Sequence, residues 1–367
     1  MARIPGLERH KHPGDVFMKA LGCDGLIVAP GVYNAMGAYQ AVSKYRESLT
    51  AGRKPTFNAV YEGHWSTSAM LLRKPDMGFV THYLDFILTN AKLTVDAAYP
   101  LPVIFDIETG FGGDRNTTHT LIEKCHQTGV AVIHLEDQAR EIKVSRRCGN
   151  HAAKLCAETE DAITMIEACL EAIGQLDSSM RLMVRTDAIT AANGSFENAV
   201  ERGKNYMSVE VNGLRPTILW ADAMYQPDQI DRWIHEFRKF DSDIILGINY
   251  SPNRDWTPAT YMKKFGQMPP TYNDLYRNGD GFSVIWHTIL QARADMEATD
   301  NILDDMDKHG AEALWKLHER QRNHPVGNAQ AMSGANEWQD FEREVGGEEA
   351  TERYDKSQGY SEEKKNN

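Results

Sequence analysis

One cysteine of the chain stands in a setting that favours chemistry. Cys148 directly follows Arg146 and Arg147 and directly precedes Gly149. Two adjacent positive charges favour a thiolate over a thiol, and glycine lets the backbone bend close to a ligand. The residues from Ser145 to Asn150 are polar and follow a strand-like run, so we expect a loop. The pattern predicts a reactive thiol that acts as a nucleophile or as an acid–base group.

The alternative for Cys148 is a small buried apolar side chain, which is the commoner fate of a single cysteine. Its polar neighbours weigh against that interpretation. The other four cysteines lie in helical or apolar stretches, and we expect them to be buried and inert: Cys23, Cys125, Cys156 and Cys169. Five scattered cysteines without a CxxC pair argue against a disulfide framework or a zinc site and fit a reducing cytoplasm.

Carboxylates gather near the ends of two predicted strands. Asp106 and Glu108 are two residues apart, so on an ideal strand both face the same side. Glu136 follows the next strand. Hard oxygen ligands of this kind suit Mg²⁺, with Mn²⁺ also possible. The alternative is that some of these side chains only cap helices or pair with Arg185.

Arg185 ends another predicted strand. A fixed guanidinium at that place can bind a substrate carboxylate through two hydrogen bonds. The alternative is a structural ion pair with Asp187 or Glu136. Because polar groups end strand after strand, packing alone does not explain them.

Eight short apolar runs alternate with helical patterns. Their apolar character is continuous, as in strands buried on both faces. In residues 159–173 apolar positions recur every three or four residues, with Thr159 as the expected N-cap. This order predicts a (β/α)8 TIM-type barrel. A doubly wound sheet is the alternative, but no GxGxxG follows the first strand. The predicted strands are 26–30, 56–61, 102–107, 130–135, 181–185, 216–220, 243–248 and 282–286.

The 367 residues suit one large barrel with additional helices, and 41% hydrophobic content is enough for a sizeable core. A net charge of -12 argues against nucleic acid and anionic membrane surfaces as partners. No apolar run reaches the length of a bilayer span, and the first residues lack the apolar core of a secretory signal. We expect an entry segment (1–22), the barrel (23–290), a C-terminal helical region (291–346) and a charged, disordered tail (347–367).

The ordered motifs resemble the isocitrate lyase family, within the isocitrate lyase/phosphoenolpyruvate mutase superfamily. That family carries Lys-Lys-Cys-Gly-His or Lys-Arg-Cys-Gly-His, and this chain has Arg146-Arg147-Cys148-Gly149-Asn150. The similarity runs from about residue 25 to 346, and the ordered set is specific although no single motif is. The other matching stretches are Val60–Trp65, Asp106–Gly113, Glu136–Gln138, Arg185–Ala188, Asn249–Trp256 and Arg343–Gly346.

The resemblance implies a barrel of the phosphoenolpyruvate mutase type, with C-terminal helices exchanged between subunits of a homodimer or homotetramer. It implies Mg²⁺-dependent cleavage of a di- or tricarboxylate with a 2-hydroxy group, giving glyoxylate or another 2-oxo acid plus a dicarboxylate. Cys148 would protonate the departing fragment. Tyr61 or a metal-linked carboxylate would take the hydroxyl proton.

The resemblance also assigns binding roles. The metal would be served, directly or through water, by Asp106, Glu108, Glu136 and Asp76. The 2-oxo acid would be held by Arg185 and by the backbone around Gly63, His64 and Trp65. The remaining substrate contacts would come from Gly149, Asn150, Asn249, Ser251, Asn253 and Trp286.

Several of these positions depart from the family pattern. Asn150, Asn253 and Trp286 replace a histidine, a serine and a threonine that hold the succinate part of isocitrate. Gly63 replaces a serine, and Asp222 replaces a glutamate. We therefore expect a remodelled pocket for the distal carboxylate. The alternatives are methylisocitrate-type cleavage, oxaloacetate hydrolysis, a phosphonate reaction (against which Cys148 counts) or a catalytically weakened dicarboxylate-binding homologue.

Overall fold

The computed structural model describes residues 9–75, 82–139 and 152–356. Its centre is a closed barrel in which neighbouring strands are parallel and follow chain order. All eight predicted strands are confirmed, each within a few residues of the expected ends. They are β1 (Ile27–Val32), β2 (Val60–Glu62), β3 (Val103–Asp106), β4 (Val132–Glu136), β5 (Arg181–Thr186), β6 (Ile218–Ala221), β7 (Ile245–Asn249) and β8 (Phe282–His287).

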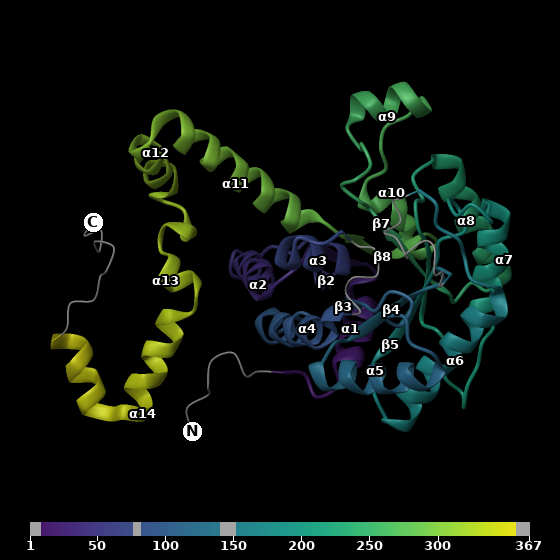
Figure 1. Cartoon of the computed structure of the whole chain (residues 1–367), viewed down its shortest axis with the longest axis horizontal. Helices are drawn as coiled ribbons and strands as arrows, with labels where there is room; N and C mark the ends of the chain where they lie inside the picture. Colours follow the sequence, from purple (N-terminus) through teal and green to yellow (C-terminus); the bar gives the residue numbers. More distant parts are fainter. Residues whose placement is uncertain (1–8, 76–81, 140–151, 357–367) are drawn as a thin grey trace. The chain divides into compact units, whose positions relative to one another are not determined.

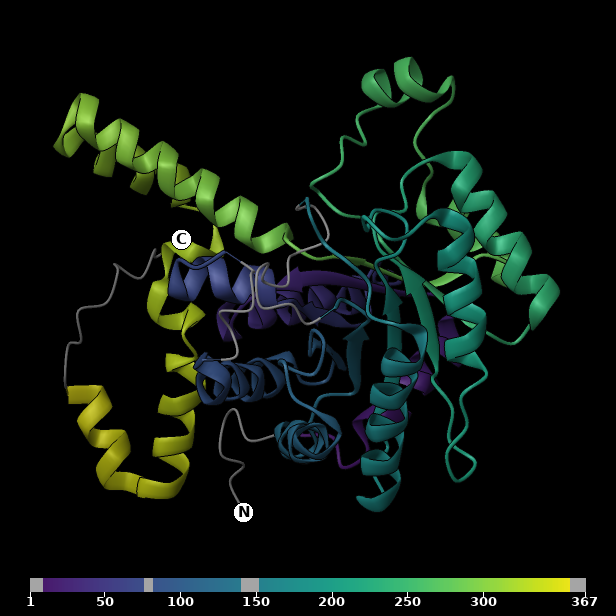
Figure 2. The same ribbon diagram turned by 45° about the vertical axis from the view of Figure 1, so that its right-hand side comes forward.

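Helices follow the strands and surround them (Figure 1, Figure 2). The predicted TIM-type barrel is therefore confirmed. The helices of this unit are α1 (Pro13–Asp24), α2 (Ala35–Thr50), α3 (His64–Leu72), α4 (Leu84–Ala98), α5 (Arg115–Thr128), α6 (Thr159–Gln175), α7 (Phe196–Met207), α8 (Pro227–Phe240), α9 (Pro258–Phe265) and α10 (Tyr272–Tyr276).

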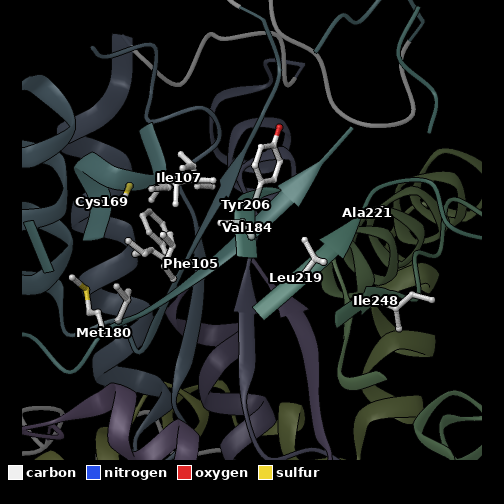
Figure 3. Close-up of a cluster of buried hydrophobic side chains, with 14 of the residues drawn as sticks. Phe105, Ile107, Cys169, Met180, Val184, Tyr206, Leu219, Ala221 and Ile248 are labelled. Carbon is white, nitrogen blue, oxygen red and sulfur yellow. The ribbon is translucent and has the colours of Figure 1, made fainter. Parts of the chain in front are cut away.

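The strands separate two buried clusters because successive side chains point to opposite faces. The outer cluster lies between strands and helices, and Figure 3 shows Phe105 and Leu219 from strands with Cys169 and Tyr206 from α6 and α7. The inner cluster fills the barrel with side chains of alternate strand residues and with Phe17 of α1. Residues 9–22 of the expected entry segment belong to the barrel unit, and Phe17 is fully buried in the inner cluster.

Two local expectations need correction. Helix α6 covers the predicted segment, but its N-cap is Glu158, and Thr159 is its first residue. In the tail expected to be disordered from residue 347, residues 347–356 are instead helical, because α14 covers Ala335–Lys356 with a break at Gly347. Residues 357–367 lie outside the described part of the chain.

Residues from Ala294 onward form a second compact unit, separate from Arg9–Arg293. Helix α11 (Leu290–His309) runs from the first unit into the second, close to the expected boundary at 290. The second unit continues with α12 (Ala311–Gln321), α13 (Ala329–Met332) and α14. None of the helices in the described ranges is long and apolar enough to cross a bilayer.

Candidate active site

Charged side chains meet at the C-terminal ends of the strands, where barrel enzymes build their active sites. Arg185 of β5 is at the centre of this group. Its Nη1 atom lies 2.9 Å from Oε2 of Glu136, and its Nε atom lies 2.8 Å from Oδ2 of Asp187. Its Nη2 atom also lies 3.7 Å from Oδ1 of Asp222. Burial opposes the charge, but the three carboxylates outweigh it and raise the pKa of Arg185 well above its usual range. The ion pair considered as the alternative role for Arg185 is therefore present.

A second buried cation shares the same carboxylates. The Nζ atom of Lys154 lies 2.5 Å from Oδ1 of Asp187 and 3.2 Å from Oδ2 of Asp222. The Lys154 side chain is 1% exposed. Although burial raises the pKa of Asp187, the Arg185 and Lys154 charges outweigh it and lower that pKa well below the usual range. Asp187 is therefore ionised at neutral pH.

Asp137 holds the end of β5 in place through several buried contacts. Its carboxylate accepts hydrogen bonds from the Asp187 backbone N–H (2.9 Å), Thr186 Oγ1 (2.8 Å) and Tyr206 Oη (2.7 Å). Arg202 adds an ion pair at 3.3 Å. These contacts join β4, β5 and α7, so Asp137 fixes the end of β5 from which Arg185 projects.

Across the barrel, Tyr61 and Asp106 form a buried pair. The Tyr61 hydroxyl lies 3.3 Å from Oδ2 of Asp106 and 3.3 Å from Nδ1 of His134. Burial, with the Asp106 charge, raises the pKa of Tyr61 well above 10, so the phenol keeps its proton at neutral pH. Burial lowers the pKa of His134 to about 4. Burial also works to raise the pKa of Asp106, but His134, His64 and Arg185 outweigh it and lower that pKa.

The loop after β3 bends sharply. Glu108, Gly110, Phe111 and Gly112 all have positive φ angles between 47° and 77°. β3 ends at Asp106, and the Glu108 N–H donates to Oδ1 of Asp106 at 2.9 Å. The expectation that Asp106 and Glu108 share one face of an ideal strand is wrong, because Glu108 lies beyond the strand in the left-handed region.

The carboxylates fit a weakly coordinated hard cation better than a closed protein cage. Among the described residues, no three His, Cys, Asp or Glu side chains are grouped closely enough to hold a metal ion. Glu136 is also paired with Arg185. Asp106, however, presents an ionised carboxylate beside Glu108, which is the chemistry Mg²⁺ prefers when it keeps several waters. The donor set thus fits Mg²⁺ bound by one or two carboxylates with water or substrate oxygens.

The end of β2 leads directly into α3. Gly63 is its N-cap, and His64 and Trp65 begin the helix. A Cβ atom at Gly63 would lie 2.7 Å from the Tyr61 ring, so a larger residue there would force the ring to shift. His64 is fully buried, and its Nδ1 atom lies 3.9 Å from Oε1 of Glu108. The helix start thus brings its backbone N–H groups beside Tyr61 and the β3 loop.

The loop after β7 holds three predicted substrate contacts. Asn249 ends the strand, and its Oδ1 atom lies 3.5 Å from the Thr288 hydroxyl. Ser251 is buried, and its hydroxyl accepts from the Asn253 N–H at 3.2 Å. The Asn253 side chain is exposed.

Trp286 of β8 lies inside the barrel and is fully buried. Its ring stacks on Tyr61 (5.8 Å between centroids) and meets Trp220 edge-on (4.8 Å). Arg185 lies over Trp220, with 4.9 Å from Cζ to the ring centroid. Trp286 therefore supports Tyr61 and Trp220 from within the barrel.

Four predicted site residues lie outside the described part of the chain: Asp76, Cys148, Gly149 and Asn150. The chain on either side of residues 140–151 is well anchored. Ala139 N–H donates to Leu155 O at 2.8 Å, and Gln138 pairs with Cys156 in an antiparallel bridge. The chain therefore leaves and rejoins the barrel at one place.

The cysteine expectations are mostly confirmed. Cys125, Cys156 and Cys169 are buried, and burial raises the pKa of Cys169 to about 12. Cys23 is exposed, contrary to expectation, because it lies on the outer side of α1.

Sequence reasoning missed Lys154, Asp137 and His134 as members of the site. His134 lies on β4 two residues before Glu136, and Asp137 directly follows the strand, so both belong to a polar strand end that the sequence shows. Lys154 had no local signal, because a lysine six residues after Cys148 looks like an ordinary surface residue.

Comparisons with known proteins agree with this geometry. The family model described as phosphoenolpyruvate phosphomutase matches residues 18–212. Isocitrate lyase from Haloferax volcanii is 29% identical over 346 residues, 94% of this chain and 89% of the relative. A 2-methylisocitrate lyase from Aeropyrum pernix is 26% identical over 313 residues, 84% of this chain and 85% of the relative.

Solved structures support the fold. The crystal structure of 2,3-dimethylmalate lyase aligns with a TM-score of 0.71 at 21% identity, covering 92% of this chain and 97% of that one. Phosphonopyruvate hydrolase in complex with oxalate and Mg²⁺ aligns with a TM-score of 0.64 at 17% identity, covering 90% and 98%. The family model spans more than half of the chain, and the expected isocitrate lyase-like relatives are found. The chain therefore belongs to the phosphoenolpyruvate mutase/isocitrate lyase superfamily of enzymes.

Proposed function

We propose that this enzyme cleaves a carbon–carbon bond of a 2-hydroxy carboxylate, with Mg²⁺, to give glyoxylate or another 2-oxo acid and a second carboxylate. One observation carries the proposal. The Arg185 guanidinium is fixed at the end of β5, in an ion pair with Glu136, on the same barrel rim as the Tyr61–Asp106 pair. A rigid carboxylate clamp beside ionised acids is what this reaction requires.

Arg185 and the start of α3 would bind the 2-oxo acid part of the substrate. The guanidinium presents two parallel donors to a carboxylate, and the first N–H groups of a helix attract anions. The substrate carboxylate would replace Glu136 in the ion pair with Arg185. Glu136 would then be free to help bind the metal ion.

The hydroxyl proton must leave as the carbonyl forms. Asp106 is the available acceptor, because its lowered pKa keeps the carboxylate ionised, whereas the raised pKa of Tyr61 keeps the phenol protonated. Tyr61 would orient Asp106 by donating a hydrogen bond to it. The electron pair of the broken carbon–carbon bond passes to the carbon next to the departing carboxylate, and Cys148 would protonate that carbon as general acid.

Asp106 and Glu108 would hold Mg²⁺, together with Glu136 once it leaves Arg185, with Asp76 as a further acidic member. The ion, when bound, would stabilise negative charge that develops on the substrate oxygen. The magnesium-bound neighbour with oxalate supports this choice of metal for the superfamily.

Trp286 suggests a substrate other than isocitrate. A fully buried indole fills the barrel interior below Tyr61, where the family has a small hydroxyl side chain. Together with Asn150 and Asn253, it would leave less room and fewer hydroxyl donors for a distal carboxylate. We propose a 2-hydroxy acid whose distal group is smaller or less polar than that of isocitrate.

The test is an assay with Mg²⁺ on isocitrate, 2-methylisocitrate and 2,3-dimethylmalate, with the 2-oxo product trapped as a hydrazone. We expect product from at least one substrate and slow turnover of isocitrate. Because 2-methylisocitrate keeps the distal carboxylate of isocitrate and 2,3-dimethylmalate lacks it, isocitrate turnover as fast as that of 2,3-dimethylmalate would contradict the remodelled pocket. Binding without any product would favour the weakened dicarboxylate-binding homologue.

The second unit suggests how copies associate. It exposes large apolar side chains, including Trp315 (65% exposed) and Val345 (60%). We propose that these helices pack against another copy in a homodimer or homotetramer of exchanged helices, working in the cytoplasm. Light scattering of the purified protein would give the subunit number, and a monomer would contradict the proposal.

A further inference from the structure

We propose that Lys154 is a positioning residue that fixes the Arg185 guanidinium through Asp187 and Asp222. The inference rests on the proposed role of Arg185 as the substrate clamp. Lys154 contacts Asp187 Oδ1 at 2.5 Å and Asp222 Oδ2 at 3.2 Å. Arg185 binds Asp187 twice, from Nε to Oδ2 at 2.8 Å and from Nη2 to Oδ1 at 2.9 Å, and its Nη2 atom lies 3.7 Å from Asp222 Oδ1. The two cations thus share both carboxylates between them.

This sharing decides where the guanidinium lies. Asp222 has a close contact with Lys154 and a long one with Arg185. A buried carboxylate needs a cationic or hydrogen-bonding partner. Without Lys154, Asp222 would compete with Asp187 Oδ1 for Nη2 of Arg185, which now donates to Asp187 at 2.9 Å, and would draw it toward β6. The guanidinium would then turn away from Glu136 and from the place of the substrate carboxylate.

The backbone at Lys154 is held independently of its side chain. Its carbonyl accepts from the Ala192 N–H at 2.9 Å, and the next residue, Leu155, accepts from Ala139. Asp137 O also accepts from the Ala157 N–H at 2.8 Å. A substitution at Lys154 would therefore change the charge next to Arg185 without changing the path of the chain.

Trp220 reports the position of Arg185. The guanidinium carbon lies 4.9 Å from the centroid of its ring, and the indole is 1% exposed. A cation over an indole changes its fluorescence, so movement of Arg185 is visible without substrate or turnover.

The first experiment measures oxalate binding with Mg²⁺ by calorimetry, using the whole chain. Lys154→Met should weaken the affinity for oxalate about 10- to 100-fold, because losing a contact that supports a binding residue typically costs that much. Lys154→Arg, which keeps the charge, should recover most of the affinity. The matched control is Lys204→Met, which breaks an ion pair with Glu236 between α7 and α8 and should leave affinity unchanged. Unchanged affinity in Lys154→Met would overturn the proposal.

The second experiment separates positioning from direct substrate contact. In Lys154→Met/Asp222→Asn one charge of each sign is removed, so Asp222 no longer draws Arg185 away. We expect this double variant to bind oxalate more tightly than Lys154→Met. No recovery would mean that Lys154 touches the ligand itself, and the positioning role would be wrong.

The third experiment needs no ligand. Lys154→Met should change the tryptophan emission of the free protein, and the change should vanish in a Trp220→Phe background. An unchanged emission would contradict the movement of Arg185. If the unmodified protein does not bind oxalate with Mg²⁺, the proposed function fails, and the emission result alone then decides the role of Lys154.

Discussion

Arg185 and Glu136 form a direct ion pair across β4 and β5, with 2.9 Å between Nη1 and Oε2. One of these residues is the proposed substrate clamp, and the other is a proposed metal carboxylate. Without a ligand, Glu136 therefore blocks a donor of Arg185 that would bind the substrate carboxylate, and Arg185 keeps Glu136 from binding the metal. Binding of the metal and of the substrate anion should consequently favour one another, because breaking one ion pair prepares both sites.

The charge of Arg185 alone should not be enough for activity. In Arg185→Lys the positive charge remains, but the two-donor geometry is lost. We expect kcat/KM to fall by about 100-fold or more, because even a small misplacement of a bound substrate slows the reaction by about that much. Steady-state kinetics on the best substrate of the panel would measure it. Arg232→Lys, in an exposed ion pair with Glu197, is the control and should keep full activity. Similar losses in both variants would argue against a clamp.

Glu62 should make the fold less stable as the pH rises. It is the last residue of β2, is fully buried and accepts a hydrogen bond from Asn90 Nδ2 at 2.8 Å, and burial raises its pKa to about 7 from 4.5. Because the folded-state pKa is raised, its contribution is complete below the unfolded-state pKa and is lost as the pH rises from 4.5 to about 7. The loss is on the order of 3 kcal/mol.

Glu62→Gln should remove that pH dependence. Urea unfolding between pH 5 and 8 would measure the free energy of unfolding for both proteins. The control, Glu123→Gln, changes an exposed glutamate of α5 and should keep the original slope. If the free energy of unfolding of Glu62→Gln fell with pH as steeply as that of the unmodified protein, Glu62 would not be the responsible group.

Replacing Trp286 should change the substrate range. Trp286→Thr removes a fully buried indole from the barrel interior and should cost about 3–5 kcal/mol of stability. We also expect isocitrate turnover to rise relative to the preferred substrate. Trp233→Thr, at an equally buried indole in the outer cluster, should lose stability without this shift in preference. A rise in relative isocitrate turnover in both variants would indicate that any loss of core packing has this effect.

Cys148 should be required for turnover and dispensable for metal binding. Cys148→Ser has a much less acidic group and should abolish lyase activity, while calorimetry with Mg²⁺ should give the original affinity. Cys23→Ser, at an exposed cysteine of α1, serves as the control and should stay active. Full activity of Cys148→Ser would remove this residue from the mechanism.

The barrel could be predicted from sequence because its strands are buried on both faces and therefore appear as continuous apolar runs. Local backbone geometry could not. The alternation that puts Asp106 and Glu108 on one face ends with β3, and the left-handed conformation of Glu108 has no signal in residue type.

In the tail, the expectation of disorder is wrong for residues 347–356. Its high charge suggested disorder, but the charges are spaced to pair along a helix, as in Glu349–Arg353 (2.5 Å) and Glu352–Lys356 (2.6 Å). The site was only partly predictable for a similar reason. Lys154 becomes significant only when folding brings it to Asp187 and Asp222, which follow it by 33 and 68 residues.

The contact between Ala139 and Leu155 has a consequence for protein design. Because the two ends of the intervening segment are joined at the rim, its length can change without shifting the register of β4 or β5. A doubling of loop length costs only about 0.6 kcal/mol in closure entropy. A designer could therefore replace the segment that carries Cys148 with one of another length and keep the same barrel.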